Sequence, residues 1–251
     1  MILILGGTTE GRDLAGYLSD AGFKIVLSAA TGFPGRDGTE APARINGSFD
    51  QGGLIGLIEE RRVRAVVDAT HPFALRISGL ARSVCAGLDL PYLRYERAFT
   101  DIPDHPDISG AATPADALAK AAAWGGNLFL ATGVKSIKSF ASGVPRERLF
   151  ARILPWPSSI DEALKWLPPE NVIAALGPFS REFNKACFDL FDARTLVTKN
   201  SGAGSGLEEK ISAALKRHMK VVIIERPPAP EGSFTGFAEV ADRLKDDADG
   251  V

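Results

Sequence analysis

A loop rich in glycine and threonine near the start of the chain is the first feature whose residue types could do chemistry. It follows the apolar run Ile-Leu-Ile-Leu at residues 2–5 and reads Gly-Gly-Thr-Thr-Glu-Gly at residues 6–11. Apolar residues at helical spacing come next, so the order is strand, tight turn and helix. Backbone N–H groups at such a helix N-terminus attract phosphate, and we expect this loop to bind the pyrophosphate of a nucleotide.

The spacing of the glycines narrows the kind of nucleotide site. The loop spells G-G-x-x-x-G, whereas the usual dinucleotide fingerprint is G-x-G-x-x-G, and no Gly-Lys-Ser/Thr of a P-loop follows. The expected phosphate contacts are the backbone of Gly6 and Gly7 and the hydroxyls of Thr8 and Thr9. We expect Glu10 to complement the helix dipole or to reach a ribose. A plain turn that binds nothing is the alternative.

The end of the second apolar run, residues 24–29, indicates which dinucleotide would bind. NAD-binding folds usually place an Asp or Glu there, which accepts a hydrogen bond from the ribose 2′-hydroxyl. This chain instead offers Ser28, Thr31 and then Arg36. Hydroxyls and a cation without a carboxylate suit a 2′-phosphate, so the sequence favours NADP over NAD.

His71 follows another apolar run, residues 64–69, in the stretch Thr-His-Pro-Phe. A histidine at this edge could contact a nicotinamide or ribose, or carry a proton. The alternative is a histidine that only caps the local backbone. No cluster of His, Cys and carboxylates has metal-ligand spacing, so we expect no protein-bound metal.

In the second half of the chain, cations recur just after the apolar runs. Lys135, Arg181 and Lys199 each lie within a few residues of such a run, and residues 199–206 read Lys-Asn-Ser-Gly-Ala-Gly-Ser-Gly. Cations and backbone N–H groups together favour anions, so this half is expected to bind a ligand rich in carboxylates. Solvated surface lysines and arginines are the alternative.

Short apolar runs alternate with helical patterns along the whole chain, which predicts an α/β fold with parallel sheets covered on both faces. The runs are residues 2–5, 24–29, 43–46, 64–69, 91–96, 127–132, 149–154, 171–176, 194–199 and 220–225. Residues 99–114 are rich in Pro, Asp and Gly and read as a linker. We therefore predict two Rossmann-like halves, 1–105 and 106–251, each a mostly parallel five-stranded sheet flanked by helices. The active site is expected in the cleft between them.

Three segments carry signals for the start of a helix. Thr113 precedes Pro114, while Ser159 with Glu162 and Ser205 with Glu208 have the spacing of a capping box.

Bulk composition excludes several classes of protein. The 251 residues are 45% apolar and 24% charged with a net charge of −2, so no basic field would attract nucleic acid or an anionic membrane. No apolar run is long enough to cross a membrane, and Cys85 and Cys187 fall on apolar helix faces as reduced core residues. We expect a soluble cytoplasmic protein; the sequence does not fix its oligomeric state, and a monomer is the working assumption.

Six stretches in order resemble the precorrin-6A reductase family of cobalamin biosynthesis. They are ILILGGTTEGRDLA, VVDATHPFA, LPYLRYER, LFLATGVKSI, ALGPFSRE and TLVTKNSGAGSGLEEKI. The likeness runs from the first apolar run to residues 220–225. It implies an enzyme that uses NADPH to reduce one double bond of a macrocyclic tetrapyrrole, giving precorrin-6B, by hydride transfer to a ring carbon and protonation of its neighbour.

The resemblance also implies roles for residues of this sequence. Those that would hold NADPH are Gly6, Gly7, Thr8, Thr9, Thr70, His71 and Phe73. Those that would face the macrocycle are Lys135, Ser136, Ser180, Arg181, Lys199, Asn200 and Ser201. Lys199 is the candidate proton donor, with a water or a substrate carboxylate as alternatives.

Three other functions fit parts of the sequence. The first is the cobalt-containing version of the same reaction in the anaerobic route. The second is a non-catalytic NADP-binding sensor, which would not need Lys135, Arg181 and Lys199 at one site. The third, a tetrapyrrole methyltransferase with an adenosyl methyl donor, is disfavoured because no carboxylate follows the second apolar run.

Overall fold

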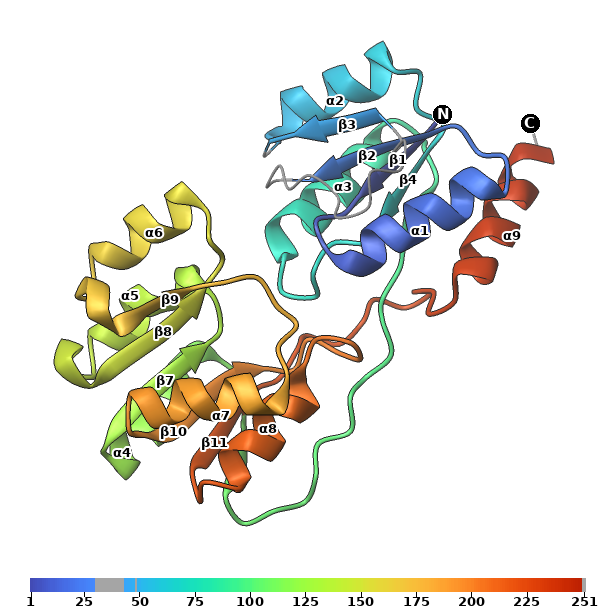
Figure 1. Cartoon of the computed structure of the whole chain (residues 1–251). Helices are drawn as coiled ribbons and strands as arrows, with labels where there is room; N and C mark the ends of the chain where they lie inside the picture. The colour runs from blue at the N-terminus through green and yellow to red at the C-terminus, as the bar shows by residue number, and fades with distance from the viewer. Residues whose placement is uncertain (30–42, 48, 250–251) are drawn as a thin grey trace. The chain divides into compact units, whose positions relative to one another are not determined.

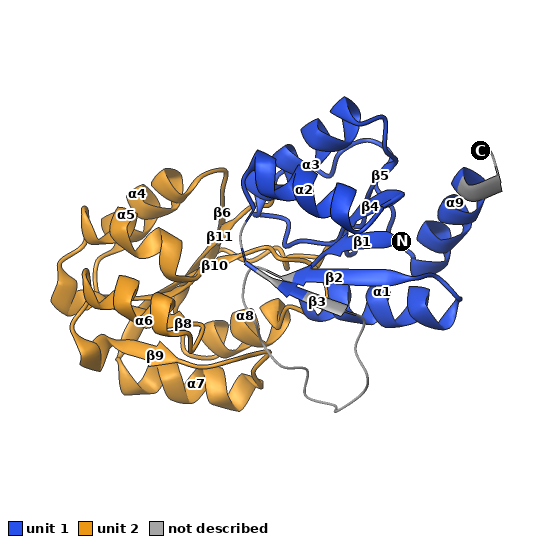
Figure 2. Ribbon diagram, turned by 90° about the horizontal axis from the view of Figure 1, so that it is seen from above, with its two compact units in different colours: residues 1–98, 227–251 blue, residues 99–226 orange. Residues whose placement is uncertain are grey.

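The computed structural model describes residues 1–29, 43–47 and 49–249. The chain forms two compact units (Figure 2). Unit 1 comprises Met1–Ala98 and Pro227–Val251, and unit 2 comprises Phe99–Arg226. Each unit is an α/β layer structure with its own hydrophobic core. An α/β fold of two parallel sheets is therefore confirmed.

Unit 1 holds a five-stranded parallel sheet in the order β3-β2-β1-β4-β5 (Figure 1). Its strands are β1 (Ile2–Leu5), β2 (Ile25–Ala29), β3 (Ala43–Asn46), β4 (Ala65–Asp68) and β5 (Tyr92–Arg94). One face is covered by α1 (Thr9–Asp20) and α9 (Phe237–Asp249), and the other by α2 (Gln51–Glu60) and α3 (Leu75–Gly87). All four residues of β1 are buried because both faces of the sheet are covered.

Unit 2 holds a six-stranded parallel sheet in the order β6-β11-β10-β7-β8-β9. Its strands are β6 (Ile108–Ala111), β7 (Asn127–Ala131), β8 (Leu149–Ile153), β9 (Val172–Ala174), β10 (Ala193–Lys199) and β11 (Lys220–Ile224). Its helices are α4 (Pro114–Trp124), α5 (Ile137–Ala141), α6 (Pro157–Leu164), α7 (Arg181–Leu190) and α8 (Leu207–Leu215). Single 3-10 turns occur at Val134–Ser136, Arg146–Arg148 and Pro169–Asn171.

The order of strands in unit 2 reverses at the pair β7 and β10. The chain continues from β7 to β8 and β9 on one side, then returns to β10 on the other side of β7 and goes on to β11. In parallel α/β sheets, ligands bind at the carboxyl edge where the strand order reverses, because the loops that follow the two strands run in opposite directions. The loops at this point begin with Thr132, after β7, and with Asn200, directly after Lys199 at the end of β10.

All ten predicted runs contain a strand, but one strand was missed. Residues 99–114 were predicted to be a linker, whereas Ile108–Ala111 forms β6 and pairs in parallel with β11. The prediction of five strands in the second sheet is therefore wrong. The sequence Ile-Ser-Gly-Ala has neither an apolar run nor strict alternation, and this short edge strand depends on its pairing with β11.

The C-terminal segment also lies elsewhere than the predicted halves placed it. Those halves were 1–105 and 106–251, whereas the compact units change at Ala98–Phe99 and again at Arg226–Pro227. Residues 227–249 return to unit 1, where Val240 and Leu244 of α9 pack in the same core as Tyr95. The backbone N–H groups of Glu96 and Phe234 also exchange hydrogen bonds between the two segments, to Phe234 O and Arg94 O, at 2.8 Å each.

The helix starts were predicted with mixed success. Thr113 caps α4 in a capping box with Asp116, and Pro114 is the first residue of the helix, as expected. By contrast α6 begins after Trp156 and α8 after Gly206, so Ser159 and Ser205 do not cap these helices. Cys85 and Cys187 are buried and free, as predicted. Across the residues that the structure describes, no helix has the length and apolar character needed to cross a membrane.

Candidate functional site

The glycine loop of unit 1 brings the end of β1 unusually close to α1. A Cβ on Gly6 would lie 3.1 Å from Gly11 Cα, and one on Gly11 would lie 3.0 Å from Gly6 Cα. The loop is tied to the neighbouring strands because Gly6 N donates to Ser28 O and Ala69 N donates to Leu5 O, both at 2.8 Å. Gly6 and Gly11 are therefore required for the contact between strand and helix, which fixes the backbone N–H groups at the start of α1.

Replacing Gly11 by alanine is expected to destabilise the protein by about 1–3 kcal/mol, because the new methyl group overpacks this contact. Gly16 lies in the same helix, and a Cβ added to it would meet nothing within 4 Å, so Gly16→Ala is the matched control. That control should gain about 1 kcal/mol from helix propensity. Chemical denaturation of both variants measures the difference; equal stabilities would show that the close contact can relax.

Thr8 and Glu10 have structural partners at the start of α1. Thr8 is the N-cap, and its hydroxyl accepts a hydrogen bond from Gly11 N at 3.1 Å. Thr9 is exposed, and its hydroxyl accepts from Arg12 at 3.1 Å. Glu10 forms an ion pair with Arg97 at 2.8 Å, which offsets its negative charge beside the expected phosphate position. Of the two roles expected for Glu10, its place in the first turn fits the dipole.

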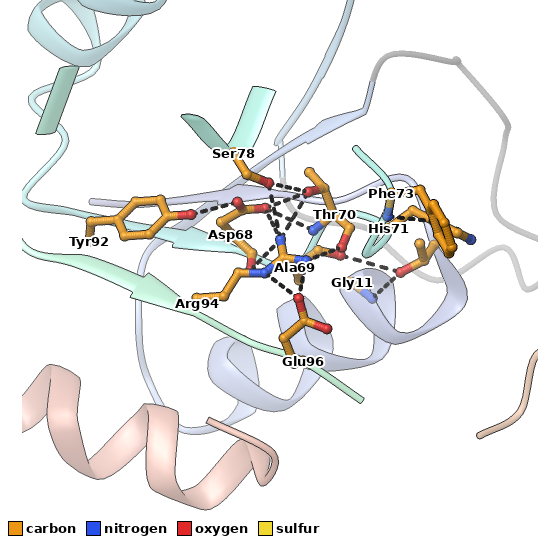
Figure 3. Close-up of polar contacts among 11 residues, drawn as sticks. Gly11, Asp68, Ala69, Thr70, His71, Phe73, Ser78, Tyr92, Arg94 and Glu96 are labelled. Carbon is orange, nitrogen blue, oxygen red and sulfur yellow. Dashed lines mark hydrogen bonds and ion pairs between the residues drawn. The ribbon is translucent and has the colours of Figure 1, made fainter. Parts of the chain in front are cut away.

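A buried charge network centred on Arg94 lies at the carboxyl ends of β4 and β5 (Figure 3). Its guanidinium contacts Asp68 Oδ1 and Glu96 Oε1 at 2.7 Å each. It also donates to Thr70 O and to Thr70 Oγ1 at 3.0 Å each. Asp68 is fully buried, and Arg94 and Glu96 are nearly so. Burial disfavours the Arg94 cation, but the two carboxylates outweigh this and raise its pKa.

The network holds the start of the Thr70–Phe73 loop. Asp68 accepts from Thr70 N at 3.0 Å and from Thr70 Oγ1 at 2.7 Å. Tyr92 donates its hydroxyl proton to Asp68 Oδ2 at 2.7 Å, and burial together with this carboxylate raises the pKa of Tyr92. Thr70 is therefore engaged by the protein itself, and its backbone is fixed for the residues that follow.

His71 and Phe73 lie next to each other at the end of this loop. Phe73 N donates to His71 Nδ1 at 3.2 Å, so Nδ1 carries no proton in this arrangement. The two rings are tilted by 43° with centroids 5.7 Å apart. This backbone contact fits the alternative in which His71 caps the local backbone. A contact of His71 with the cofactor stays a prediction.

The residues expected to select the 2′-phosphate are only partly described. Ser28 is buried near the end of β2. Thr31 and Arg36 lie outside the described residues, so the expected preference for NADP stays a prediction.

In unit 2, Lys199 and Lys135 lie at the point where the strand order reverses. Lys199 is the last residue of β10 and is partly buried, while Lys135 is exposed in the turn that follows β7. Burial, and secondly the positive charge of Lys135, lower the pKa of Lys199. Ser136 is buried and hydrogen-bonds to Thr132 Oγ1 and Gly133 O, so its hydroxyl shapes this turn.

The loop after β10 is organised by Asn200. This buried side chain accepts from Gly202 N at 3.3 Å and donates to Thr100 O at 3.5 Å. Gly202, Gly204 and Gly206 all have positive φ, which explains why the loop is glycine-rich. Ser201 is partly buried beside them. Asn200 therefore acts on the shape of the loop, in addition to any contact with a ligand.

Ser180 and Arg181 open α7 after β9. Ser180 is the N-cap and accepts from Phe183 N at 3.2 Å, and Arg181 is exposed and pairs with Glu182 at 3.3 Å. The loop before α7 lies beside the glycine-rich loop that follows β10, because a Cβ on Gly206 would be 3.4 Å from Pro178 Cβ. The positive charge of Lys135 thus acts on Lys199. Arg181 begins the helix after β9, and β8 lies between β9 and β7 in the sheet.

Four polar partners of the Thr70–Phe73 loop were not predicted from the sequence, namely Asp68, Tyr92, Arg94 and Glu96. A signal was present, since charged residues end two otherwise apolar runs in the stretches VVDATHPFA and LPYLRYER. Among the described residues no group of three or more His, Cys, Asp or Glu could hold a metal ion.

Comparison with known proteins places this arrangement in a family. Residues 1–245 match the family model described as Precorrin-6x reductase CbiJ/CobK. The cobalt-precorrin-6A reductase of Methanocaldococcus jannaschii is 34% identical over 228 residues, which cover 90% of each chain. The precorrin-6A reductase of Rhodobacter capsulatus is 33% identical over 242 residues, covering 91% of this chain and 89% of the relative.

A solved structure of CobK precorrin-6A reductase has the same fold. It superposes with a TM-score of 0.81 at 28% identity, covering 98% of this chain and 96% of that one. The resemblance inferred from the six sequence stretches is thereby confirmed. The chain belongs to the precorrin-6x reductase family, and it is an oxidoreductase.

Proposed function

We propose that this protein reduces one ring double bond of precorrin-6A with NADPH and so forms precorrin-6B in cobalamin biosynthesis. Family membership supports the reductase class. The observation that carries the proposal is Lys199, a partly buried lysine of lowered pKa at the reversal point of the unit 2 sheet. A reduction of this kind needs a proton beside the incoming hydride, and Lys199 is placed where a ligand is expected.

The residues of unit 1 fit a dinucleotide. The close contact of Gly6 with Gly11 and the cap at Thr8 hold the N–H groups at the start of α1 ready for a pyrophosphate. Gly7 and Thr9 are exposed at this edge and available to it. When bound, NADPH supplies the hydride. His71 and Phe73 are proposed to contact the nicotinamide end, on a loop whose backbone is held by Arg94.

The residues of unit 2 fit a ligand with several carboxylates. Lys135 and Arg181 are exposed cations, and the N–H groups of the loop after Lys199 add further donors. We assign macrocycle binding to Lys135, Ser136, Ser180, Arg181, Asn200 and Ser201. Lys199 is proposed to donate the proton to the carbon next to the one that receives the hydride. A lysine whose pKa is lowered transfers its proton more readily than an ordinary lysine.

The proposal is tested by anaerobic titration of the protein with NADPH or NADH, followed by precorrin-6A. We expect NADPH absorbance to fall only when the macrocycle is present, with a matching shift of the tetrapyrrole bands and little turnover with NADH. NADPH binding without turnover of any macrocycle would overturn the reaction and favour the NADP-binding sensor.

Cobalt-precorrin-6A is the second candidate substrate. The relative from Methanocaldococcus jannaschii is named for that substrate and the one from Rhodobacter capsulatus for the metal-free form. Both macrocycles are therefore assayed in parallel. Faster turnover of the cobalt form would assign the protein to the alternative reaction without changing the proposed roles of its residues.

A further inference from the structure

Two buried cations lie in unit 2 outside the residues assigned above. Arg152 is the fourth residue of β8 and is 8% exposed, and Lys210 lies in the first half of α8 and is 9% exposed. The positive charge of Arg152 acts on Lys210 and contributes to the lowered pKa of that lysine. Buried cations normally have an anionic partner, because removing a charge from water is costly.

Arg152 has neutral partners. One guanidinium N–H donates to Asn184 Oδ1 at 2.9 Å, and the guanidinium lies over the Phe179 ring, 4.2 Å from its centroid. The nearby Cys187 is a neutral thiol at ordinary pH, because burial raises its pKa. Burial lowers the pKa of Arg152. Guanidinium has five N–H donors, of which Asn184 accepts one and the Cys187 sulfur another.

Lys210 lacks a strong counter-charge among the described residues. Burial, and then the charge of Arg152, lower its pKa to about 8, and Glu209 acts weakly in the opposite direction. Glu209 is itself exposed. In the part of the chain that the structure describes, no carboxylate forms an ion pair with Lys210 or Arg152. Geometry also links the two cations, because Phe179 packs on the Arg152 guanidinium, and Lys210 N donates to Gly206 O at 3.3 Å beside Pro178.

The loop over this region leads to the proposed substrate residues. The Asn184 amide that accepts from Arg152 also donates to Phe179 O at 3.3 Å and to Ser180 O at 2.8 Å. Asn184 therefore connects Arg152 to the residues directly before Arg181. α8, which carries Lys210, begins after Gly206, whose Cβ position is 3.4 Å from Pro178 Cβ. Arg152, through Asn184, and the start of the helix that carries Lys210 both contact the loop of residues 177–180.

We propose that Arg152 and Lys210 form a buried binding site for one carboxylate arm of the substrate, beneath the loop of residues 177–180. A carboxylate would accept hydrogen bonds from the ammonium and from a guanidinium N–H, and it would offset the repulsion between the two cations. The site would recognise the position of one carboxylate arm of the macrocycle. This inference rests on the proposed function. Inorganic phosphate has similar acceptor chemistry and is the competing ligand.

The test replaces Lys210 by methionine, which keeps the length and apolar stem of the side chain but removes the charge. We expect KM for precorrin-6A to rise about tenfold or more, the effect of one lost charge-assisted hydrogen bond, with little change in kcat. Lys210→Arg should restore most of the affinity. Lys216→Met, an exposed lysine at the end of the same helix, is the matched control and should leave KM unchanged.

A second measurement needs no turnover. The melting temperature of the wild type should rise with added propionate relative to the same concentration of chloride, and Lys210→Met should lose this increase without being less stable. A lower melting temperature of Lys210→Met together with an unchanged KM would show a structural lysine and overturn the proposal. Stabilisation by phosphate but not propionate would overturn the carboxylate assignment. If the wild type does not reduce precorrin-6A but retains the propionate effect, the anion site stands and the reaction falls.

Discussion

We expect Lys199→Met to lower kcat by about 10²–10⁴-fold, the usual contribution of a positioned general acid, and to leave the Kd of NADPH unchanged. The reason is that Lys199 belongs to unit 2, whereas the residues assigned to the cofactor belong to unit 1. Steady-state kinetics and a fluorescence titration with NADPH measure the two effects separately. Lys138→Met is the control, because Lys138 is exposed and stacks over Trp166.

The pH dependence of the wild type follows from the same residue. As the proposed acid, Lys199 works only when protonated, so we expect kcat to fall as the pH rises through its pKa. Since burial and Lys135 lower that pKa, the fall occurs at lower pH than for an ordinary lysine. Lys135→Met removes one of the two causes of the lowered pKa and should shift the fall of kcat to higher pH.

An unchanged kcat with a raised KM in Lys199→Met would show that this lysine only binds the substrate.

Arg94→Met destabilises the protein by about 3–5 kcal/mol, because it leaves Asp68 and Glu96 buried without their cation. The pKa of Arg94 is raised in the folded protein, so its contribution is present at all pH values below its ordinary pKa and is lost only in strongly alkaline solution. The difference from the wild type should thus persist across the neutral range. Chemical denaturation at several pH values measures it.

A surface ion pair provides the comparison for Arg94. Arg61 pairs with Glu60 at 3.2 Å and both side chains are exposed, so Arg61→Met should cost less than about 1 kcal/mol. Arg94→Met should also weaken NADPH binding, since the Thr70–Phe73 loop loses two hydrogen bonds. Equal stabilities of the two variants would contradict the structural role assigned to the buried network.

The fold was largely predictable because local patterns determine most of its elements. Apolar runs identified ten strands, and the expected pairings are parallel throughout both sheets. The strand β6 was not predictable, since its residues form a strand only beside β11. The placement of α9 was equally hidden, because an apolar helix face indicates burial but not which of two sheets it covers.

The site was predictable where chemistry depends on the backbone. The glycine loop before α1 and the position of Lys199 at the end of a strand follow from the motif and from the apolar runs, whereas the cap at Thr8 and the reversal of strand order beside Lys199 were not predicted. Contacts between distant side chains were not predictable, as Arg94 with Asp68 and Arg152 with Asn184 show. Glu10 illustrates the same limit, since its partner Arg97 lies far along the chain.

The most direct test of the proposed reaction follows the hydride itself. The protein is incubated anaerobically with precorrin-6A and NADPH carrying deuterium at C4 of the nicotinamide, and the product is analysed by mass spectrometry and NMR. The account predicts that this deuterium is found on one ring carbon of precorrin-6B, and that the proton on the neighbouring carbon comes from solvent. Oxidation of NADPH with no cofactor deuterium in the macrocycle would contradict direct hydride transfer.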